Sequence, residues 1–124
     1  MSGVARMYSV VLDCPDPKAL AAFYAGLLGW KVTSEEEDWV TLTGDDQGRL
    51  SFQRVPGHRP PAWPDAGHSQ QFHLDLVVDD PVRAEKEALA LGAVRHEHQP
   101  GAGHGWTVYL DPAGHPFCLC ASSA

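Results

Sequence analysis

Two cysteines, a histidine and an aspartate are the side chains of this sequence best suited to chemistry. Cys118 and Cys120 alternate with apolar residues in PFCLC near the end of the chain, and His73 and Asp75 alternate in the same way in QFHLDLVV. Because side chains two apart on a strand share a face, each pair lies on one side of its strand. The cysteines can be metal ligands, a redox pair or the wall of a pocket. Parallel side chains make a poor disulfide, so we expect an inert pocket wall.

His73 is the strongest single candidate, and several roles are open to it. It can bind a metal, act as a general base together with Asp75, or hydrogen-bond a ligand. A purely structural contact with Asp75 is the alternative. His104, between glycines in GAGHGW, is predicted to lie on a movable loop over a pocket. Trp39 and Trp106 can stack on a planar ligand.

The elements that position these side chains occur twice along the chain. In each copy a β-rich strand is followed by a helix and then by three strand-like runs. Asp16-Pro17 and Asp80-Pro81, 64 positions apart, begin the two helices, since aspartate caps a first turn and proline suits the first helical position. The repeat predicts an α+β fold of two tandem βαβββ modules. The single domain 1–124 then divides into module one (5–55), a Pro- and Gly-rich linker (56–70) and module two (71–121).

Alternation along the strands assigns two faces to each module. In QFHLDLVV the apolar set is predicted to pack on the helix of module two: Phe72, Leu74, Leu76 and Val78. The opposite faces of the two modules collect a mainly polar set: Ser9, Asp13, Trp39, Thr41, Ser51, Gln53, Gln71, His73, Asp75, Cys118 and Cys120. We expect these faces to curve around a ligand pocket, with the helices on the outer face.

With this organisation the sequence resembles the vicinal oxygen chelate superfamily, which includes glyoxalase I, extradiol dioxygenases and bleomycin-resistance proteins. The resemblance rests on DPKALAAFYAGLLGWKV, FHLDLVVDD and WTVYLDPAGHPFCL, and the small glyoxalase-like domain proteins are the subgroup it indicates. It implies a curved, half-barrel-like sheet around a pocket and a homodimer. In metal-dependent members the ligands lie on the first and last strand of each module, and carrying these positions over gives Ser9, Gln53, His73 and Cys118.

Serine and cysteine at two of these positions depart from the carboxylates and imidazoles usual in the family. We therefore expect no metal cofactor; a divalent metal, if one binds, would use His73, Gln53 and Cys118. The composition limits the other partners. A net charge of −7 without a Lys/Arg run argues against nucleic acid, and the longest uncharged stretch is too short for a bilayer. Three cysteines without a framework pattern or secretory signal favour the cytoplasm.

The function expected from the sequence is binding of a small molecule without the family's usual metal centre, as in sequestration of a metabolite or drug. One alternative is a metal-dependent lyase, isomerase or dioxygenase. Another is a metal-free acid/base enzyme that uses His73 and Asp75. The expected ligand-binding set is Ser9, Trp39, Gln53, His73, His104, Trp106 and Cys118.

Overall fold

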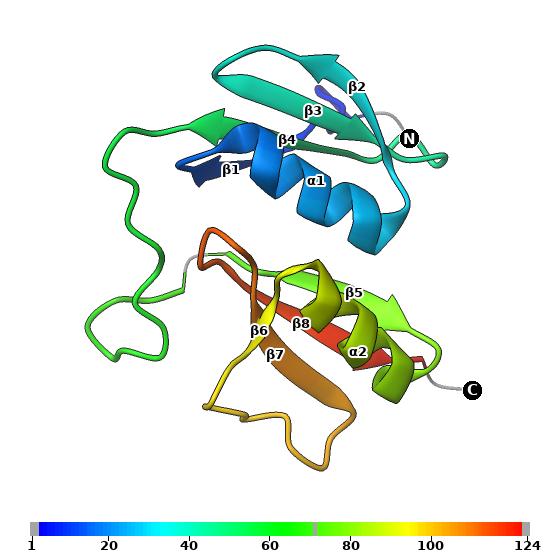
Figure 1. Ribbon diagram of the computed structural model, residues 1–124, viewed down its shortest axis with the longest axis vertical. Coiled ribbons are helices and arrows are strands. Elements are labelled where there is room, and N and C mark those ends of the chain that lie inside the picture. Colours follow the sequence, from blue (N-terminus) through cyan, green and yellow to red (C-terminus); the bar gives the residue numbers. More distant parts are fainter. Residues whose placement is uncertain (1–2, 71, 123–124) are drawn as a thin grey trace. The chain divides into compact units, whose positions relative to one another are not determined.

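A computed structural model describes residues 3–70 and 72–122. The chain forms two compact units, Met1–His58 and Arg59–Ala124, and each has its own sheet and helix (Figure 1). Most of the predicted linker therefore groups with the second unit. Gln71, where module two was predicted to begin, lies outside the described residues.

The first unit contains one helix and a four-stranded open sheet. Its elements are β1 (Val10–Cys14), α1 (Pro17–Leu28), β2 (Lys31–Glu35), β3 (Trp39–Thr43) and β4 (Arg49–Arg54). The strand order is β1-β4-β3-β2. β1 runs parallel to β4, and the other neighbours are antiparallel.

The second unit repeats this topology. Its elements are β5 (Leu74–Val78), α2 (Pro81–Leu91), β6 (Val94–Arg95), β7 (Trp106–Leu110) and β8 (Pro116–Ala121). The order β5-β8-β7-β6, with β5 parallel to β8, matches that of the first sheet. The predicted α+β class and the tandem βαβββ modules are confirmed, and both sheets are open.

Local sequence sets the two helix boundaries as predicted. The side chain of Asp16 accepts a hydrogen bond from the Ala19 N–H at 3.2 Å, and Asp80 accepts one from Arg83 at the same distance. Each helix then ends at a glycine in the left-handed region, Gly29 at φ 72° and Gly92 at φ 117°. A residue with a Cβ atom is disfavoured at such φ values, so the glycines end the helices at low cost.

Each unit has an apolar core on the helix side of its sheet. In the first, Tyr24 of α1 is fully buried and stacks on Phe52 of β4, with ring centroids 5.7 Å apart. In the second, Tyr109 of β7 stacks on Phe117 of β8 at the same separation. Burying such rings removes 150–250 Å² of surface each, so each sheet has an aromatic pair that fixes its packing.

The predicted start of both first strands was wrong. β1 begins at Val10 instead of near residue 6, and β5 begins at Leu74. Phe72, predicted to belong to the core, lies outside β5 and is 86% exposed. The alternating pattern continues through residues that have no neighbouring strand to pair with, and alternation alone cannot show where pairing stops.

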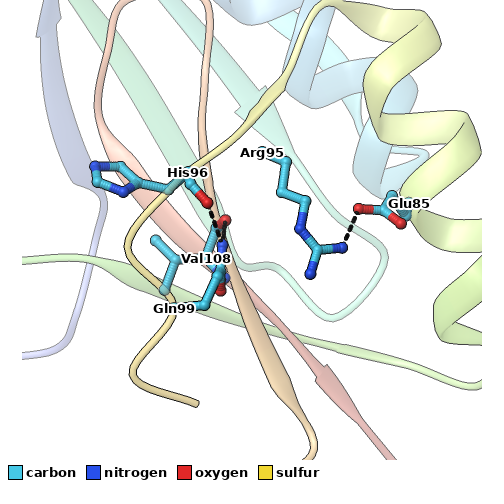
Figure 2. Close-up of polar contacts among 5 residues, drawn as sticks. All are labelled: Glu85, Arg95, His96, Gln99 and Val108. Atoms are coloured by element: carbon cyan, nitrogen blue, oxygen red, sulfur yellow. Dashed lines mark hydrogen bonds and ion pairs between the residues drawn. The ribbon is translucent and has the colours of Figure 1, made fainter. Parts of the chain in front are cut away.

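The edge of the second sheet is completed by a side chain. β6 has only two residues, but Gln99 continues the ladder beyond it (Figure 2). Its Nε2 donates to the carbonyl oxygens of His96 (2.7 Å) and Val108 (2.8 Å), and its Oε1 accepts from Val108 N at 2.9 Å. His96 N also donates to Val108 O at 3.0 Å. The side chain of Gln99 therefore adds to the backbone hydrogen bonds of β7, and it fixes the start of the loop that contains His104.

An ion pair joins α2 to the same edge. Arg95 Nη1 lies 2.8 Å from Glu85 Oε1 (Figure 2), and Glu85 also hydrogen-bonds the buried Tyr109. Burial, followed by the charge of Glu85 and this hydrogen bond, raises the pKa of Tyr109 to about 12. None of the described helices is long and apolar enough to cross a membrane.

The segment between the two sheets is attached to both units. His58 N donates to Val55 O at 3.1 Å in the first unit. In the second, Pro60 lies so close to Gly114 that a Cβ atom there would come within 2.5 Å of it. The Trp63 ring packs edge-on against the rings of His96 and His98, at centroid distances of 4.9 and 5.3 Å.

Candidate functional site

The second sheet brings three reactive side chains together. Asp75 of β5 and Cys118 of β8 are register partners on parallel strands, and His73 stands directly before β5. His73 Nε2 lies 3.1 Å from Asp75 Oδ1, and the potential ligand atoms of all three side chains lie within 4.8 Å of one another. His73 and Asp75 are exposed, whereas Cys118 is 5% exposed.

The electrostatics of this cluster keep the thiol neutral. Burial raises the pKa of Cys118 to about 12, and the negative charge of Asp75 and a hydrogen bond to it act in the same direction. Burial and Asp75 also raise the pKa of Cys120. A nucleophilic cysteine needs a neighbouring base or positive charge that lowers its pKa. Here a carboxylate lies between the thiol and the imidazole, so Cys118 is not activated.

In the first unit, Ser9 and Ser51 occupy the positions that correspond to His73 and Cys118. Their hydroxyl groups are part of a chain of hydrogen bonds. Ser9 Oγ and Ser51 Oγ lie 2.8 Å apart, and Ser51 Oγ lies 3.0 Å from Thr41 Oγ1. Trp39 Nε1 donates to Thr41 at 3.2 Å, and Ser9 Oγ donates to Val10 O at 3.3 Å. Ser51 is 1% exposed. Each hydroxyl therefore has partners within the sheet.

The strand register shows which residues of the two sheets correspond. Val11 of β1 pairs with Ser51 as Asp75 of β5 pairs with Cys118. By register Ser51 is therefore the counterpart of Cys118, whereas Gln53 pairs with Asp13. The helix starts are 64 positions apart, but Ser51 and Cys118 are 67 apart. The connections between strands differ in length, so each strand has to be aligned separately.

The divalent metal that the resemblance implies does not fit the corresponding positions of the two sheets, which are Ser9 and Ser51 in the first and His73 and Cys118 in the second. Ser9 and Ser51 are neutral hydroxyls that hydrogen-bond each other, and protein sites for zinc and similar ions use imidazole, thiolate and carboxylate groups. The second unit does contain three donors of suitable type. A metal there would have to displace the proton of a thiol whose pKa is about 12.

The remaining predicted residues fall into separate places. Trp39 and Gln53 are direct cross-strand partners on β3 and β4. Trp106 of β7 lies against Gly101, where any side chain would collide with the indole. The backbone of His104 donates to Gly101 O at 2.8 Å, and Gly105 O accepts from Ala121 at 2.8 Å. The loop predicted to be movable thus has backbone hydrogen bonds at both ends.

Comparison with known proteins gives the family. The model of the glyoxalase-like domain matches residues 9–120, and the chain belongs to this family. This agrees with the tandem βαβββ fold, and with the resemblance to the vicinal oxygen chelate superfamily seen in the sequence. A search of functionally curated proteins found no match.

Solved structures with the same fold are distant in sequence. A protein from Agrobacterium tumefaciens, solved by NMR, is 16% identical with a TM-score of 0.72, covering 98% of this chain and 100% of that one. A glyoxalase/bleomycin resistance protein/dioxygenase family enzyme from Burkholderia phytofirmans is 18% identical with a TM-score of 0.72, covering 94% and 98%. A possible glyoxalase from Bacillus cereus is 13% identical with a TM-score of 0.66, covering 93% and 97%. At these identities the likeness establishes the fold alone.

Proposed function

We propose that this protein binds a small organic molecule without the divalent metal usual in its superfamily. The observation that supports this most directly is the hydrogen bond between Ser9, one of the four positions carried over from the superfamily, and Ser51, the register counterpart of Cys118. A divalent metal at these two positions would meet neutral hydroxyls in place of charged ligands. The remaining positions, His73 and Cys118, offer one imidazole and one buried thiol whose pKa is raised to about 12.

His73 is the proposed polar contact to the ligand. The carboxylate of Asp75, 3.1 Å from Nε2, favours the proton on that nitrogen and limits rotation of the ring. Nδ1 then remains for a hydrogen bond with the ligand. The same pair supports a second candidate, a metal-free acid/base enzyme, because an imidazole oriented by a carboxylate is a common proton-transfer group. The closeness of His73, Asp75 and Cys118 supports a metal-dependent enzyme as the third.

The test is native mass spectrometry of freshly purified protein, with a co-purified small molecule as the expected result. Replacing His73 by Ala is expected to weaken its binding by about 1–2 kcal/mol, the value of a hydrogen bond lost on binding. His68→Ala is the matched control, since His68 also contacts an aspartate, Asp65, at 3.0 Å but lies in the linker. Equal retention of the molecule by both variants would refute the role of His73.

Elemental analysis separates the metal-dependent alternative. After dialysis we expect less than about a tenth of an equivalent of zinc, iron or manganese, on the ligand-count argument. A stoichiometric metal that is lost in His73→Ala would contradict the proposal and favour a metalloenzyme. Turnover of the co-purified molecule, with its loss in Asp75→Asn, would favour the acid/base enzyme instead.

A further inference from the structure

One end of the first sheet has a depression large enough for a small ligand. Its volume is about 390 Å³, and its lining comes from β3, β4 and the residues beside them: Asp38, Trp39, Gln53, Arg54 and Pro56. Ligand sites in proteins typically measure about 300–1,000 Å³. Every lining residue belongs to the first unit, so the depression is defined within that unit alone.

Trp39 gives this depression an aromatic wall. The side chain is half-buried, and its only polar atom, Nε1, already donates to Thr41 at 3.2 Å. The indole therefore has its ring surface, but no further hydrogen-bond donor, to contribute to a ligand. Aromatic surfaces favour flat, unsaturated partners, which stack with large contact area.

Gln53 gives the depression a defined polar edge. Its Nε2 donates to Asp13 Oδ1 at 3.2 Å, and this contact fixes the amide orientation because a carboxylate oxygen accepts hydrogen bonds and repels a carbonyl oxygen. Within residues 3–70 and 72–122, Oε1 has no hydrogen-bond partner. One acceptor and the second N–H of the amide thus remain for a ligand.

The two charged residues that line the depression, Asp38 and Arg54, form an ion pair. Arg54 Nη1 lies 3.6 Å from Asp38 Oδ1, with side-chain exposures of 50% and 73%. A cationic or an anionic ligand would gain little there, because each charge already has an opposite neighbour and both are solvated. A neutral ligand is therefore favoured.

We infer that this depression binds a neutral, flat heteroaromatic lactam that stacks on Trp39 and pairs its adjacent N–H and C=O with the amide of Gln53. The inference rests on the proposed small-molecule function and names the chemical class of the ligand. The lactam N–H donates to Gln53 Oε1, and the lactam carbonyl accepts from Gln53 Nε2. Two hydrogen bonds between matched amide edges distinguish a lactam from a plain aromatic hydrocarbon.

The experiment uses the full chain and two probes, quinolin-2-one and its N-methyl derivative, with affinity measured by calorimetry. The N-methyl compound keeps the flat ring and the carbonyl but loses the donor. We expect it to bind at least about fivefold more weakly, as for one lost hydrogen bond. Equal affinity for the two probes, or no binding of quinolin-2-one, would overturn the inference.

Variants of the two contact residues complete the test. Gln53→Leu and Trp39→Leu are each expected to weaken quinolin-2-one binding at least about fivefold, and Trp39→Phe should restore part of the affinity because it keeps a ring. Gln70→Leu, which removes a glutamine outside the depression, should leave binding unchanged. Circular dichroism checks that each variant folds. Unchanged affinity in folded Gln53→Leu would overturn the pairing.

The result can be separated from that of the proposed function. If quinolin-2-one fails to bind while a co-purified molecule still depends on His73, the lactam inference is wrong and the proposed function stands. If quinolin-2-one binds through Gln53 and no molecule depends on His73, the lactam site stands and the role of His73 is wrong.

Discussion

Replacing Asp75 by Asn should make the Cys118 thiol more reactive, and the structure sets the size of the effect. At pH 8 an ordinary thiol with a pKa near 9 is about 10% thiolate, whereas Cys118, with a pKa of about 12, is about a thousandfold less ionised. Thiolates of higher pKa are stronger nucleophiles, with a Brønsted coefficient of about 0.4–0.5. The two effects together predict alkylation of Cys118 about 30- to 60-fold slower than that of a free thiol.

Asp75→Asn removes the neighbouring charge but leaves burial, the larger cause of the raised pKa. Loss of one nearby charge typically lowers a pKa by about one unit. The same Brønsted relation then predicts a rate increase of about three- to fourfold. Asp65→Asn, which removes the carboxylate of a second His–Asp contact, should leave the rate unchanged.

The assay is alkylation with iodoacetamide at pH 8, followed by peptide mass mapping. Each of the three cysteines then reports its own rate, and the rates in urea give the unfolded reference. Cys14, fully buried, serves as an internal marker of unfolding. The reasoning is refuted if Cys118 in the folded protein reacts as fast as in urea, or if Asp75→Asn leaves its rate unchanged while Cys14 stays protected.

Three further outcomes are expected. The pKa values of Tyr109 and Cys118 in the folded state are both raised to about 12. The free energy of unfolding, measured by urea titration, should therefore be highest below about pH 9 and fall as the pH rises toward 12. An unchanged free energy of unfolding over that range would contradict both raised pKa values. Gln99→Leu should lower the free energy of unfolding by about 1–3 kcal/mol, because Val108 N–H loses its partner. An unchanged urea midpoint would refute the contribution of the Gln99 side chain to the sheet edge. Light scattering at micromolar concentration should give a dimer, and a mass of 13.4 kDa would exclude it.

The sequence was sufficient for features set by neighbouring residues. Asp16 and Asp80 begin helices because their carboxylates reach the free N–H groups three residues on, and this contact involves four consecutive positions. The alternation in β4 and β8 likewise identified Phe52 and Phe117 as core residues. Helix caps and strand alternation depend only on residues that are close together in the sequence. The repeat of the two modules could therefore be predicted from them.

Features that depend on pairing between distant strands could not be predicted in the same way. Register makes Ser51 the partner of Val11 as it makes Cys118 the partner of Asp75, and the sequence alone does not show these pairings. Gln99 completes a sheet edge through its side chain, and no sequence pattern distinguishes it from a solvated glutamine. The closeness of His73 to Asp75 was anticipated because the alternation in QFHLDLVV predicts both side chains on one face. Homodimer formation and the role of His104 stay predictions.

The contacts of the linker limit how much chain is free between the two modules. His58 is fixed to the first unit, and Pro60 and Trp63 lie against other residues of the second, so very little chain is free between them. The distance that a flexible segment can span grows with its number of free residues. The segment 56–70 is therefore a short tether, with a much smaller reach than fifteen unattached residues would have. Breaking the Trp63 contacts would lengthen the free chain without changing a residue of either sheet.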